Sequence, residues 1–342
     1  MEWKDRSGIT ALCQVLDTEE CDYRLARAQI GYIYVEKQRP DKKSGKVRDL
    51  CYPPDTSMLY AVQKRLKERV LNELTLLTEV RGYRKNSHNI NTSADVCGQP
   101  FSGKVDISKF HPSITPRHVA TALTEHGLSP SWSREIAHVV TFKGSVAQGA
   151  PSSNHIANIV MDSLLRRYVK PFADRLNVQL RNFGDDIVFF GNDAVAVRAC
   201  VAQAKKAFRK LGFKANEKKC RDCEHRGERR EFVGCATGRE HPDYPREKYL
   251  GFRKELRALC HAERMRSPSA PLTTAKQLNS LKHRIVYVRR LNPKKARKLF
   301  DLFYRLCDAR RASPCVTSPA PGVALVERTG KVPQTPTICP AV

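Results

Sequence analysis

The sequence predicts a mixed α+β protein built from two or three subdomains. The chain has 342 residues, which is enough to bury a full hydrophobic core. Short β-prone runs alternate with longer segments of helical periodicity. After Pro245 the β-prone runs stop, and the pattern becomes helical and basic. These observations predict a mixed core followed by a helical subdomain.

The charge balance favours a polyanionic partner. The chain has 61 Lys and Arg residues against 35 Asp and Glu, a net charge of +26, which makes nucleic acid the first candidate. A basic membrane-surface protein is the competing class, but no long apolar run occurs. The charged segment Met1 to Arg6 argues against a signal peptide, so the twelve cysteines are expected to be reduced thiols. We therefore expect a soluble, cytoplasmic protein without a membrane partner.

The first hundred residues are expected to contain short helices and a basic hairpin. Residues 1–28 mix charged and apolar positions and predict one or two short helices. Residues 31–36 and 47–52 predict two strands joined by a basic turn. Lys46 and Arg48 near this bend suit a triphosphate, Arg by its planar fork and Lys as a point charge, although solvated hairpin charges are the alternative.

The next segments place one carboxylate at the end of a strand. An apolar stripe predicts a helix over 58–77, and 101–106 predicts a strand that ends at Asp106. Thr115 and Pro116 are a capping residue and a first-turn residue for the following helix. An Asp inside an apolar strand register needs a partner, so Asp106 is a candidate metal ligand facing a cleft.

Small and turn-forming residues then open another helix. Residues 144–153 are rich in Gly, Ala and Ser, and a helix is expected from 154 to 168, with Ser152 or Ser153 as its cap. Asp193 is expected to cap a helix that ends at Gly212. A short strand is expected over 232–236.

Two adjacent carboxylates, Asp185 and Asp186, lie between apolar β-prone runs. Gly184 supplies the positive φ that a tight hairpin turn needs, so both carboxylates are expected at the bend. Neighbouring anions repel, and a divalent metal is the usual counter-charge for such a pair. A plain surface turn is the alternative interpretation.

The C-terminal third carries much of the positive charge. Residues 246–311 contain 19 Lys or Arg residues against 5 Asp or Glu, with a helix expected to start at Asn292-Pro293. We expect this region to grip a nucleic-acid backbone through counterion release. The candidate contacts are Arg246, Lys248, Arg253, Lys254, Arg289 and Arg290. Residues 313–342 are rich in Pro, Ser and Thr and are expected to be disordered.

Four motifs in order carry a resemblance to a known family. They are Lys104–Ile114, Ala147–Ser153, Phe183–Asp186 and Asn216–Lys219. Over residues 30–305 the chain resembles reverse transcriptases, most closely those of bacterial retrons and related defence-associated enzymes. The resemblance implies a right-hand polymerase fold with fingers, a palm made of an antiparallel sheet with helices, and a helical thumb.

The resemblance also implies domain boundaries. The expected parts are an N-terminal helical extension (1–28), fingers (29–100), a palm with an interleaved fingers segment (101–240), a basic helical thumb (241–312) and a disordered tail (313–342).

For the catalytic centre, the resemblance implies that Asp106, Asp185 and Asp186, with the backbone carbonyl of Ile107, bind two Mg²⁺ ions, with Mn²⁺ as the alternative. Carboxylates are the ligand type that Mg²⁺ prefers, and two ions would serve nucleotidyl transfer. Lys219 matches the lysine that protonates the departing pyrophosphate.

For the nucleotide, the resemblance implies that Lys46 and Arg48 hold the triphosphate. Gln148 and Gly149 would lie against the nascent base pair and the template. His111 falls where the family has a bulky aromatic residue that excludes the ribose 2′-hydroxyl, and Phe110 either shares this role or packs into the core.

Several positions depart from the family pattern. Phe183 replaces the usual Tyr of Tyr-x-Asp-Asp, and His111 replaces Phe or Tyr. Residues 93–97 stand in place of the retron Asn-Ala-x-x-His element, and 233–235 in place of Val-Thr-Gly. These differences favour a defence-associated reverse transcriptase over a true retron enzyme.

One cysteine cluster has two interpretations. Cys220, Cys223 and His225, with Cys235 nearby, offer zinc-ligand types, but a second Cys-x-x-Cys at compatible spacing is absent. Incidental cytosolic thiols are the favoured interpretation.

The resulting prediction is an RNA-directed DNA polymerase that uses dNTPs and a dedicated non-coding RNA template, makes DNA, and serves antiphage defence. A co-encoded effector protein and a second copy of the chain are further candidate partners. Template-independent or protein-primed DNA synthesis by the same site is one alternative. A catalytically silent RNA-binding polymerase scaffold is a second, and RNA-dependent RNA synthesis is a third.

Overall fold

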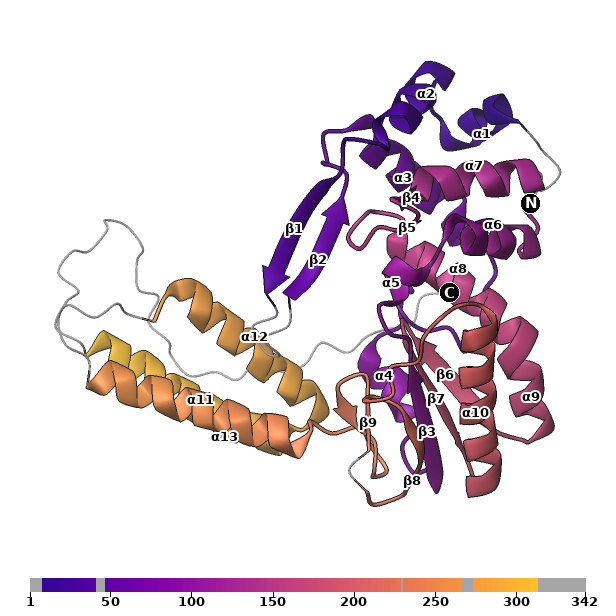
Figure 1. The fold of residues 1–342 in the computed structure, drawn as a ribbon. Coiled ribbons are helices and arrows are strands. Elements are labelled where there is room, and N and C mark those ends of the chain that lie inside the picture. The colour runs from indigo at the N-terminus through magenta and orange to yellow at the C-terminus, as the bar shows by residue number, and fades with distance from the viewer. Residues whose placement is uncertain (1–7, 41–46, 229, 266–272, 313–342) are drawn as a thin grey trace, which may run out of the picture. The chain divides into compact units, whose positions relative to one another are not determined.

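The computed structural model describes residues 8–40, 47–228, 230–265 and 273–312 (Figure 1). The chain divides into two compact units, Met1–Lys248 and Tyr249–Val342, and each is described by itself. The expected disordered tail, 313–342, and Lys46 lie outside the described residues. Within the described residues, no helix is both long enough and apolar enough to cross a membrane.

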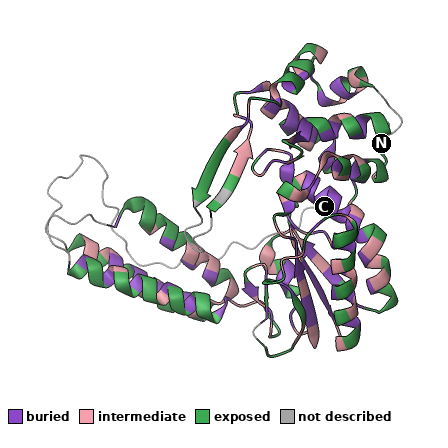
Figure 2. Cartoon of the chain, in the orientation of Figure 1, coloured by how far each residue is buried: buried purple, intermediate pink, exposed green. Residues whose placement is uncertain are grey.

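A four-stranded antiparallel sheet is the centre of the first unit, with strand order β6-β7-β3-β8. Its strands are β3 (Phe101–Asp106), β6 (Gln179–Phe183), β7 (Asp186–Gly191) and β8 (Arg221–His225). Helix α10 (Ala194–Lys210) packs against β3, β7 and β8. Figure 2 shows the sheet as a buried layer, in contrast to the exposed two-stranded hairpin of β1 (Val35–Pro40) and β2 (Val47–Tyr52).

The two faces of the sheet bury different side chains, because successive residues of a strand point to opposite faces. Val105, Ile187 and Phe189 belong to the large core beneath the helices. Val188 and Phe190 belong to a smaller cluster on the other face. The register pairs Asp106 with Asp186 and Lys104 with Val188, so these residues share the face of the smaller cluster.

Gly103 lets the helix approach the centre of the sheet. A Cβ atom built on Gly103 would lie 2.7 Å from Val201 Cγ2 and 2.6 Å from the carbonyl oxygen of Asp222. Any larger residue would push α10 away from β3, so this position needs glycine for a close approach.

Helices complete the first unit. In chain order they are α1 (Ile9–Leu16), α2 (Glu20–Gln29), α3 (Met58–Arg69), η1 (Leu71–Glu73), α4 (Asn89–Ala94), α5 (Phe110–Ser113), α6 (Pro116–Glu125), α7 (Pro130–Val140), α8 (Ser153–Leu164), η2 (Leu165–Val169) and α9 (Lys170–Arg175). Two further pairs of short strands are β4 (Thr141–Phe142) with β5 (Ser145–Val146), and β9 (Glu231–Phe232) with β10 (Cys235–Ala236).

Several predicted elements are confirmed by local chemistry. Thr115 caps α6 in a capping box with His118. The Asp193 side chain accepts from the Val195 amide at 2.8 Å and caps α10. The strand expected over 101–106 ends at Asp106, as predicted.

Other boundaries were wrong. The helix expected over 58–77 ends at Arg69, and the strand expected over 31–36 is shifted to Val35–Pro40. Ser152 occupies the N-cap position of α8 without a side-chain capping bond; its hydroxyl lies 3.4 Å from Gln63 Oε1 instead. Tyr34, just before β1, is buried and stacks on Phe142 at 4.3 Å.

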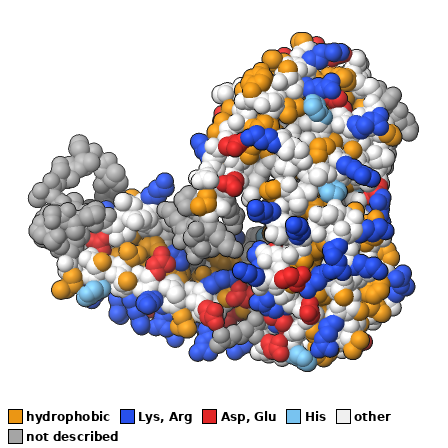
Figure 3. Space-filling model, viewed as in Figure 1, with side chains coloured by type: hydrophobic (Ala, Val, Ile, Leu, Met, Phe, Trp, Pro, Cys, Tyr) orange, Lys and Arg blue, Asp and Glu red, His pale blue; other side chains and the backbone are white. Residues whose placement is uncertain are grey.

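Lys and Arg side chains are spread over the displayed face of the first unit, with acidic side chains in smaller groups between them (Figure 3). Helix α10 contains five Lys or Arg residues and no Asp or Glu. The first unit is therefore itself basic on its outer helix.

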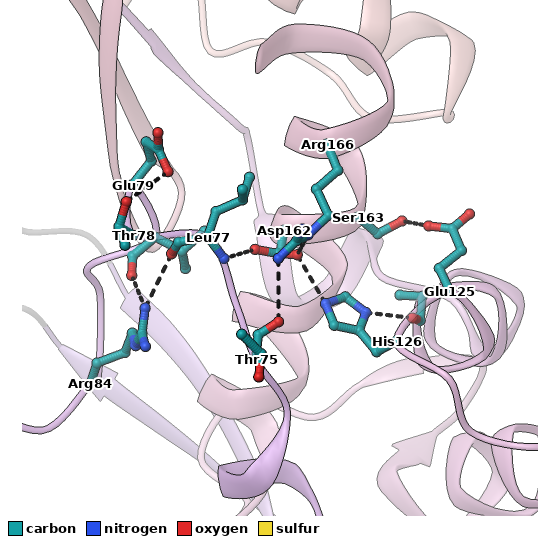
Figure 4. Close-up of polar contacts among 12 residues, drawn as sticks. Thr75, Leu77, Thr78, Glu79, Arg84, Glu125, His126, Asp162, Ser163 and Arg166 are labelled. Atoms are coloured by element: carbon teal, nitrogen blue, oxygen red, sulfur yellow. Dashed lines mark hydrogen bonds and ion pairs between the residues drawn. The ribbon is translucent and has the colours of Figure 1, made fainter. Parts of the chain in front are cut away.

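A buried carboxylate, Asp162 on α8, ties together segments that are far apart in sequence (Figure 4). It is fully buried and accepts hydrogen bonds from the Leu77 amide at 2.5 Å, from His126 Nε2 at 2.9 Å and from Arg166 Nε. Arg166 also donates to the carbonyl of Thr75. This network fixes Thr75 and Leu77, which belong to the non-helical part of the segment expected to be a helix over 58–77.

In its described residues the second unit contains α12 (Ala275–Leu291), α13 (Pro293–Arg311) and α11 (Arg246–Arg264) from Tyr249 onward. Asn292 caps α13, as predicted, by accepting from the Lys295 amide at 3.0 Å. Phe252, Ile285 and Leu299 are among its buried residues. Arg284 lies over the Phe252 ring at 3.8 Å and pairs with Glu255, so its charge is partly used within the unit.

Replacing Asp162 by Asn is expected to lower the free energy of unfolding by about 2 kcal/mol at pH 7, because a neutral amide at this buried position cannot replace the carboxylate oxygens that accept from Leu77, His126 and Arg166. Burial opposes ionisation, but hydrogen bonds from His126, Arg166 and Leu77 outweigh it, and the pKa of Asp162 is lowered. The stabilisation is therefore full above the unfolded-state pKa of about 3.9 and is lost as the pH falls through the lower folded-state value.

Urea denaturation at pH 7, 5 and 3 measures this effect. The difference in the free energy of unfolding between wild type and Asp162→Asn is expected to become smaller only at pH 3. Asp174→Asn, which removes an exposed carboxylate on α9, is the control and is expected to change stability by less than about 0.5 kcal/mol. If this difference in stability is the same at all three pH values, the ionised carboxylate of Asp162 is not the source of the stabilisation.

Candidate active site

Three carboxylates meet where β3 ends and β7 begins. Asp106 and Asp186 are paired in the register of these strands. Phe183 pairs with Asp186 across the hairpin, so the turn consists of Gly184 and Asp185. One carboxylate oxygen from each Asp lies within 4.8 Å of the others. The cluster predicted from the sequence is therefore assembled, although Asp186 begins a strand rather than lying in the bend.

The turn is held by backbone and amide contacts. Gly184 has φ 65°, the left-handed conformation expected at this position. The buried Asn182 side chain donates to the carbonyls of Gly184 at 2.9 Å and Asp186 at 3.0 Å. The Ile107 amide donates to the Asp185 carbonyl at 3.1 Å. These bonds fix the direction in which Asp185 and Asp186 project.

Two lysines supply positive charge to the cluster. Lys219 Nζ lies 2.6 Å from Asp106 Oδ2 and 4.0 Å from Asp185 Oδ2. Lys104 Nζ lies 3.9 Å from Asp186 Oδ1. The amide of Asn216 donates to the Asp106 carbonyl at 2.8 Å, which brings the segment before Lys219 to the end of β3.

The charges perturb one another. Burial, and then the charge of Asp106, raise the pKa of Asp185. Burial raises the pKa of Asp186 to about 7, with Lys104 opposing the shift and the two neighbouring carboxylates adding to it. Partial burial opposes the charged form of Lys219, but its hydrogen bond to Asp106 and the carboxylate charges outweigh this, so the pKa of Lys219 is raised.

The donor set fits a hard divalent cation. Asp106 Oδ1 and Asp186 Oδ1 are buried and make no hydrogen bond within the described part of the chain. Oxygen ligands of this kind are preferred by Mg²⁺, and Mn²⁺ accepts the same type. In the ranges that the structure describes, no cysteine or histidine joins this cluster.

The segment 79–84 supports the turn and was missed by the sequence prediction. Val80 forms a parallel bridge with Asn182, and the Arg81 amide donates to the Asn182 carbonyl at 2.9 Å. A Cβ atom built on Gly82 would lie 2.6 Å from the Gly184 nitrogen. Nothing in the local sequence indicates this long-range pairing. Lys104, by contrast, could have been found, because residues two apart in a strand share a face.

Of the predicted nucleotide-binding residues, the two fingers cations are largely outside the described part of the chain, and Phe110 is buried. Arg48 lies in β2 opposite Arg39, but its side chain is outside the described part, as is all of Lys46. Phe110 is 4% exposed and packs against Phe213 at 5.8 Å, so it lies in the core, the second of the two expectations.

His111 contacts the first turn of α8, and Gln148 and Gly149 contact the end of β2. His111 Nε2 lies 3.2 Å from Asn154 Oδ1, and burial lowers the pKa of His111. The Gln148 carbonyl accepts from the Cys51 amide at 2.8 Å. A Cβ atom on Gly149, which has φ 123°, would lie 3.6 Å from Tyr52. These bonds join the end of the β2 strand to the segment before α8.

The predicted nucleic-acid contacts lie on α11 and α12. Lys254, Arg289 and Arg290 are exposed in the second unit. Lys248 pairs with Glu231 at 2.6 Å, and Arg253 lies over the Tyr249 ring at 5.6 Å. Arg246 is exposed at the start of α11. Their role in gripping nucleic acid stays a prediction.

A carboxylate cluster at the end of an antiparallel sheet, with an adjacent lysine, is the kind of site that nucleotidyl-transfer enzymes use. Residues 40–253 match the family described as reverse transcriptase (RNA-dependent DNA polymerase). This is more than half of the chain, and the chain belongs to that family. The predicted resemblance and the α+β, right-hand polymerase class are therefore confirmed.

Curated relatives include two retron enzymes. The chain is 28% identical over 280 residues to the retron Mx65 reverse transcriptase of Myxococcus xanthus, covering 75% of this chain and 61% of that protein. It is 25% identical over 259 residues to the retron Ec86 reverse transcriptase of Escherichia coli, covering 75% and 74%. The chain thus spans less than two thirds of the length of the Mx65 enzyme.

Among solved structures, the chain is similar to a Sicinivirus 3Dpol RNA-dependent RNA polymerase. The TM-score is 0.49 at 11% sequence identity, covering 84% of this chain and 66% of that one.

Divalent cations are expected to stabilise the wild-type protein by mass action. At about 100 times Kd, Mg²⁺ or Mn²⁺ should raise Tm by about 5 °C. Asp106→Asn and Asp186→Asn are expected to abolish this rise. In the absence of the ion, Asp186→Asn should be at least as stable as wild type, because one of three neighbouring negative charges is gone.

Thermal unfolding with and without Mn²⁺ checks this expectation, with the exposed Asp301→Asn as a control that responds like wild type. Equal shifts in all four proteins would show that the ion binds elsewhere.

Gly82→Ala is expected to destabilise the first unit by about 1–3 kcal/mol, since its Cβ would collide with backbone atoms of the turn. It should also reduce the Mn²⁺-dependent rise in Tm, because the turn carries Asp185 and leads directly into Asp186 at the start of β7. Gly31→Ala, which meets no atom within 4 Å, is the matched control and should leave both quantities nearly unchanged. Wild-type behaviour of Gly82→Ala in both measurements would contradict the close approach.

Proposed function

We propose that this chain is an RNA-directed DNA polymerase that joins dNTPs to a growing DNA strand on an RNA template. The observation that supports this most directly is the meeting of Asp106, Asp185 and Asp186 within 4.8 Å, beside Lys219, in a chain of the reverse transcriptase family. Bound at these carboxylates, two divalent ions would supply charge stabilisation to the reacting phosphate.

The residues of the chain take distinct parts in this proposal. The primer 3′-hydroxyl gives up its proton to solvent, its oxygen forms a bond to the α-phosphorus of the dNTP, and the bond from that phosphorus to the pyrophosphate oxygen breaks. Asp106, Asp185 and Asp186, with the Ile107 carbonyl, hold the cations. Lys219, whose raised pKa keeps it an ammonium, gives a proton to the departing pyrophosphate.

The other predicted residues complete the site. Lys46 and Arg48 hold the triphosphate, Gln148 and Gly149 lie against the nascent pair, and His111 borders the sugar. The exposed cations of α11 and α12 grip the duplex backbone.

The template and the biological role form a second part of the proposal. Likeness to two retron reverse transcriptases supports a dedicated non-coding RNA as template and a role in antiphage defence. An effector protein and self-association stay predictions.

Primer extension on a defined RNA template tests the proposed activity. Wild type is expected to incorporate dNTPs in preference to rNTPs, with Mg²⁺ or Mn²⁺ required. Asp185→Asn/Asp186→Asn should lower the rate by at least about 10³-fold, since the charges that stabilise the transition state are lost. Asp174→Asn serves as the surface control.

The alternatives give different products. Synthesis that persists after the RNA is digested would indicate template-independent polymerisation, and DNA linked to protein would indicate protein priming. Preference for rNTPs would indicate RNA synthesis. No incorporation by wild type with any nucleotide would overturn the proposal in favour of a silent RNA-binding scaffold.

A further inference from the structure

A cavity of about 360 Å³ lies beside the segment that supports the catalytic turn. Its volume is within the range of sites that bind small organic groups. The residues that line it are Leu71, Asn72, Leu74, Leu76, Tyr83, Arg84, Lys85, His155, Asn158 and Ile159. They come from three places in the chain: the segment after α3, the segment after Gly82, and the first turns of α8.

The walls of this cavity are anchored independently of any ligand (Figure 4). As described above, Asp162 accepts a hydrogen bond from the Leu77 amide, and Arg166 donates one to the Thr75 carbonyl. Arg84 Nη1 donates to the carbonyls of Leu77 and Val80, both at 3.1 Å. A cavity with fixed walls binds its ligand without first paying the cost of ordering them.

Two residues that line the cavity, Asn158 and His155, each have a buried polar atom without a partner in the described ranges. Asn158 is 3% exposed, and its Nδ2 donates to the Gly82 carbonyl at 2.5 Å, which leaves Oδ1 without a hydrogen bond. His155 Nδ1 is likewise without one. A buried acceptor in this state costs about 1–3 kcal/mol, and a ligand that offers an N–H group would recover part of that cost.

The remaining wall residues favour a nucleobase with its phosphate. Leu71, Leu74 and Ile159 form an apolar lining suited to a planar ring. Tyr83 is 45% exposed and offers an aromatic face of the kind on which unpaired bases stack. Arg84 and Lys85 are exposed cations of this lining, and none of the described residues that line the cavity is Asp or Glu.

The cavity is also close to the catalytic turn. A Cβ atom built on Gly184 would lie 3.4 Å from the Tyr83 hydroxyl, and the Tyr83 and Phe183 rings are 6.2 Å apart. A base in the cavity is therefore separated from the turn by one aromatic side chain.

We propose that this cavity binds one unpaired base of the template RNA strand, flipped out of the stack just ahead of the base that is being copied. This inference rests on the proposed polymerase function. Asn158 Oδ1 accepts from the amino or imino group of the base, Tyr83 lies against its ring, and Arg84 and Lys85 contact the adjacent phosphates.

The affinity of the full-length protein for primer–template duplexes tests the proposal. RNA templates with unpaired 5′ overhangs of zero to five nucleotides are compared by fluorescence anisotropy at one salt concentration. At one particular overhang length, the added nucleotide is expected to increase the affinity by about tenfold over the next shorter overhang, since stacking of one base is worth about 1–3 kcal/mol. This increase is called the step. An abasic nucleotide at that position should remove the step while retaining the phosphate.

Two substitutions locate the effect in the cavity. Leu76→Trp fills the cavity from a partly exposed position and should abolish the step without weakening binding to the blunt duplex. Leu176→Trp, at an exposed leucine on the first unit, is the matched control. Lys85→Gln should weaken the step, and the exposed Lys64→Gln should not.

The outcomes separate this inference from the proposed function. If wild type extends primers but affinity rises smoothly with overhang length, or the abasic nucleotide keeps the step, the cavity does not bind a template base. If the rise in affinity at one overhang length persists in Leu76→Trp, the template base does not bind in this cavity. Competition by free nucleotides at the cavity, without any overhang step, would show a mononucleotide site instead. Absence of primer extension would count against the polymerase proposal alone.

Discussion

The pairing of β3 with β7 is the constraint on which the site depends. It brings Asp106 and Asp186 together from positions eighty residues apart in sequence, at a place where burial disfavours two negative charges. Without the ladder between these strands, the two carboxylates would move apart. The packing of α10 on one face of the sheet and of the Phe190 cluster on the other therefore has a direct chemical role: it keeps like charges close.

The lysines near the cluster reduce this electrostatic cost without cancelling it. Lys219 contacts Asp106 and reaches towards Asp185, while Lys104 faces Asp186 from the same strand as Asp106. Each carboxylate thus has a cation nearby, yet one oxygen of Asp106 and one of Asp186 remain without hydrogen bonds in the described part of the chain. The arrangement keeps capacity for a further cation, which a purely structural salt-bridge network would not need.

The sequence predicted those features that depend on local chemistry. Gly184 marks the turn by its left-handed conformation, and Asp193 and Asn292 mark helix starts by side-chain capping. The position of Asp106 at a strand end follows from the apolar run before it. These signals act over a few residues, so they can be read without knowing the fold.

Features that depend on distant partners could not be predicted in this way. After α3 ends at Arg69, the amide of Leu77 donates to Asp162, which lies 85 residues further along the chain. Gly82 supports the turn because its backbone lies against that of Gly184. A Cβ atom at position 82 would lie only 2.6 Å from the Gly184 nitrogen, so a larger residue does not fit. Periodicity and propensity carry no information about such pairs, because the partner residues are chosen by the tertiary fold.

The β1–β2 hairpin has a consequence for local motion. It forms a sheet of two strands only, and its described side chains are largely exposed. A lone two-stranded ribbon is marginally stable. The Cys51 amide donates to the Gln148 carbonyl and Glu36 pairs with Lys143, so both contacts join the same end of the hairpin to the rest of the unit. Its amide hydrogens should therefore exchange with solvent through small opening events, at a lower free energy than those of β3 and β7. The described strands β1 and β2 are therefore expected to open locally more readily than the strands that carry the carboxylate cluster.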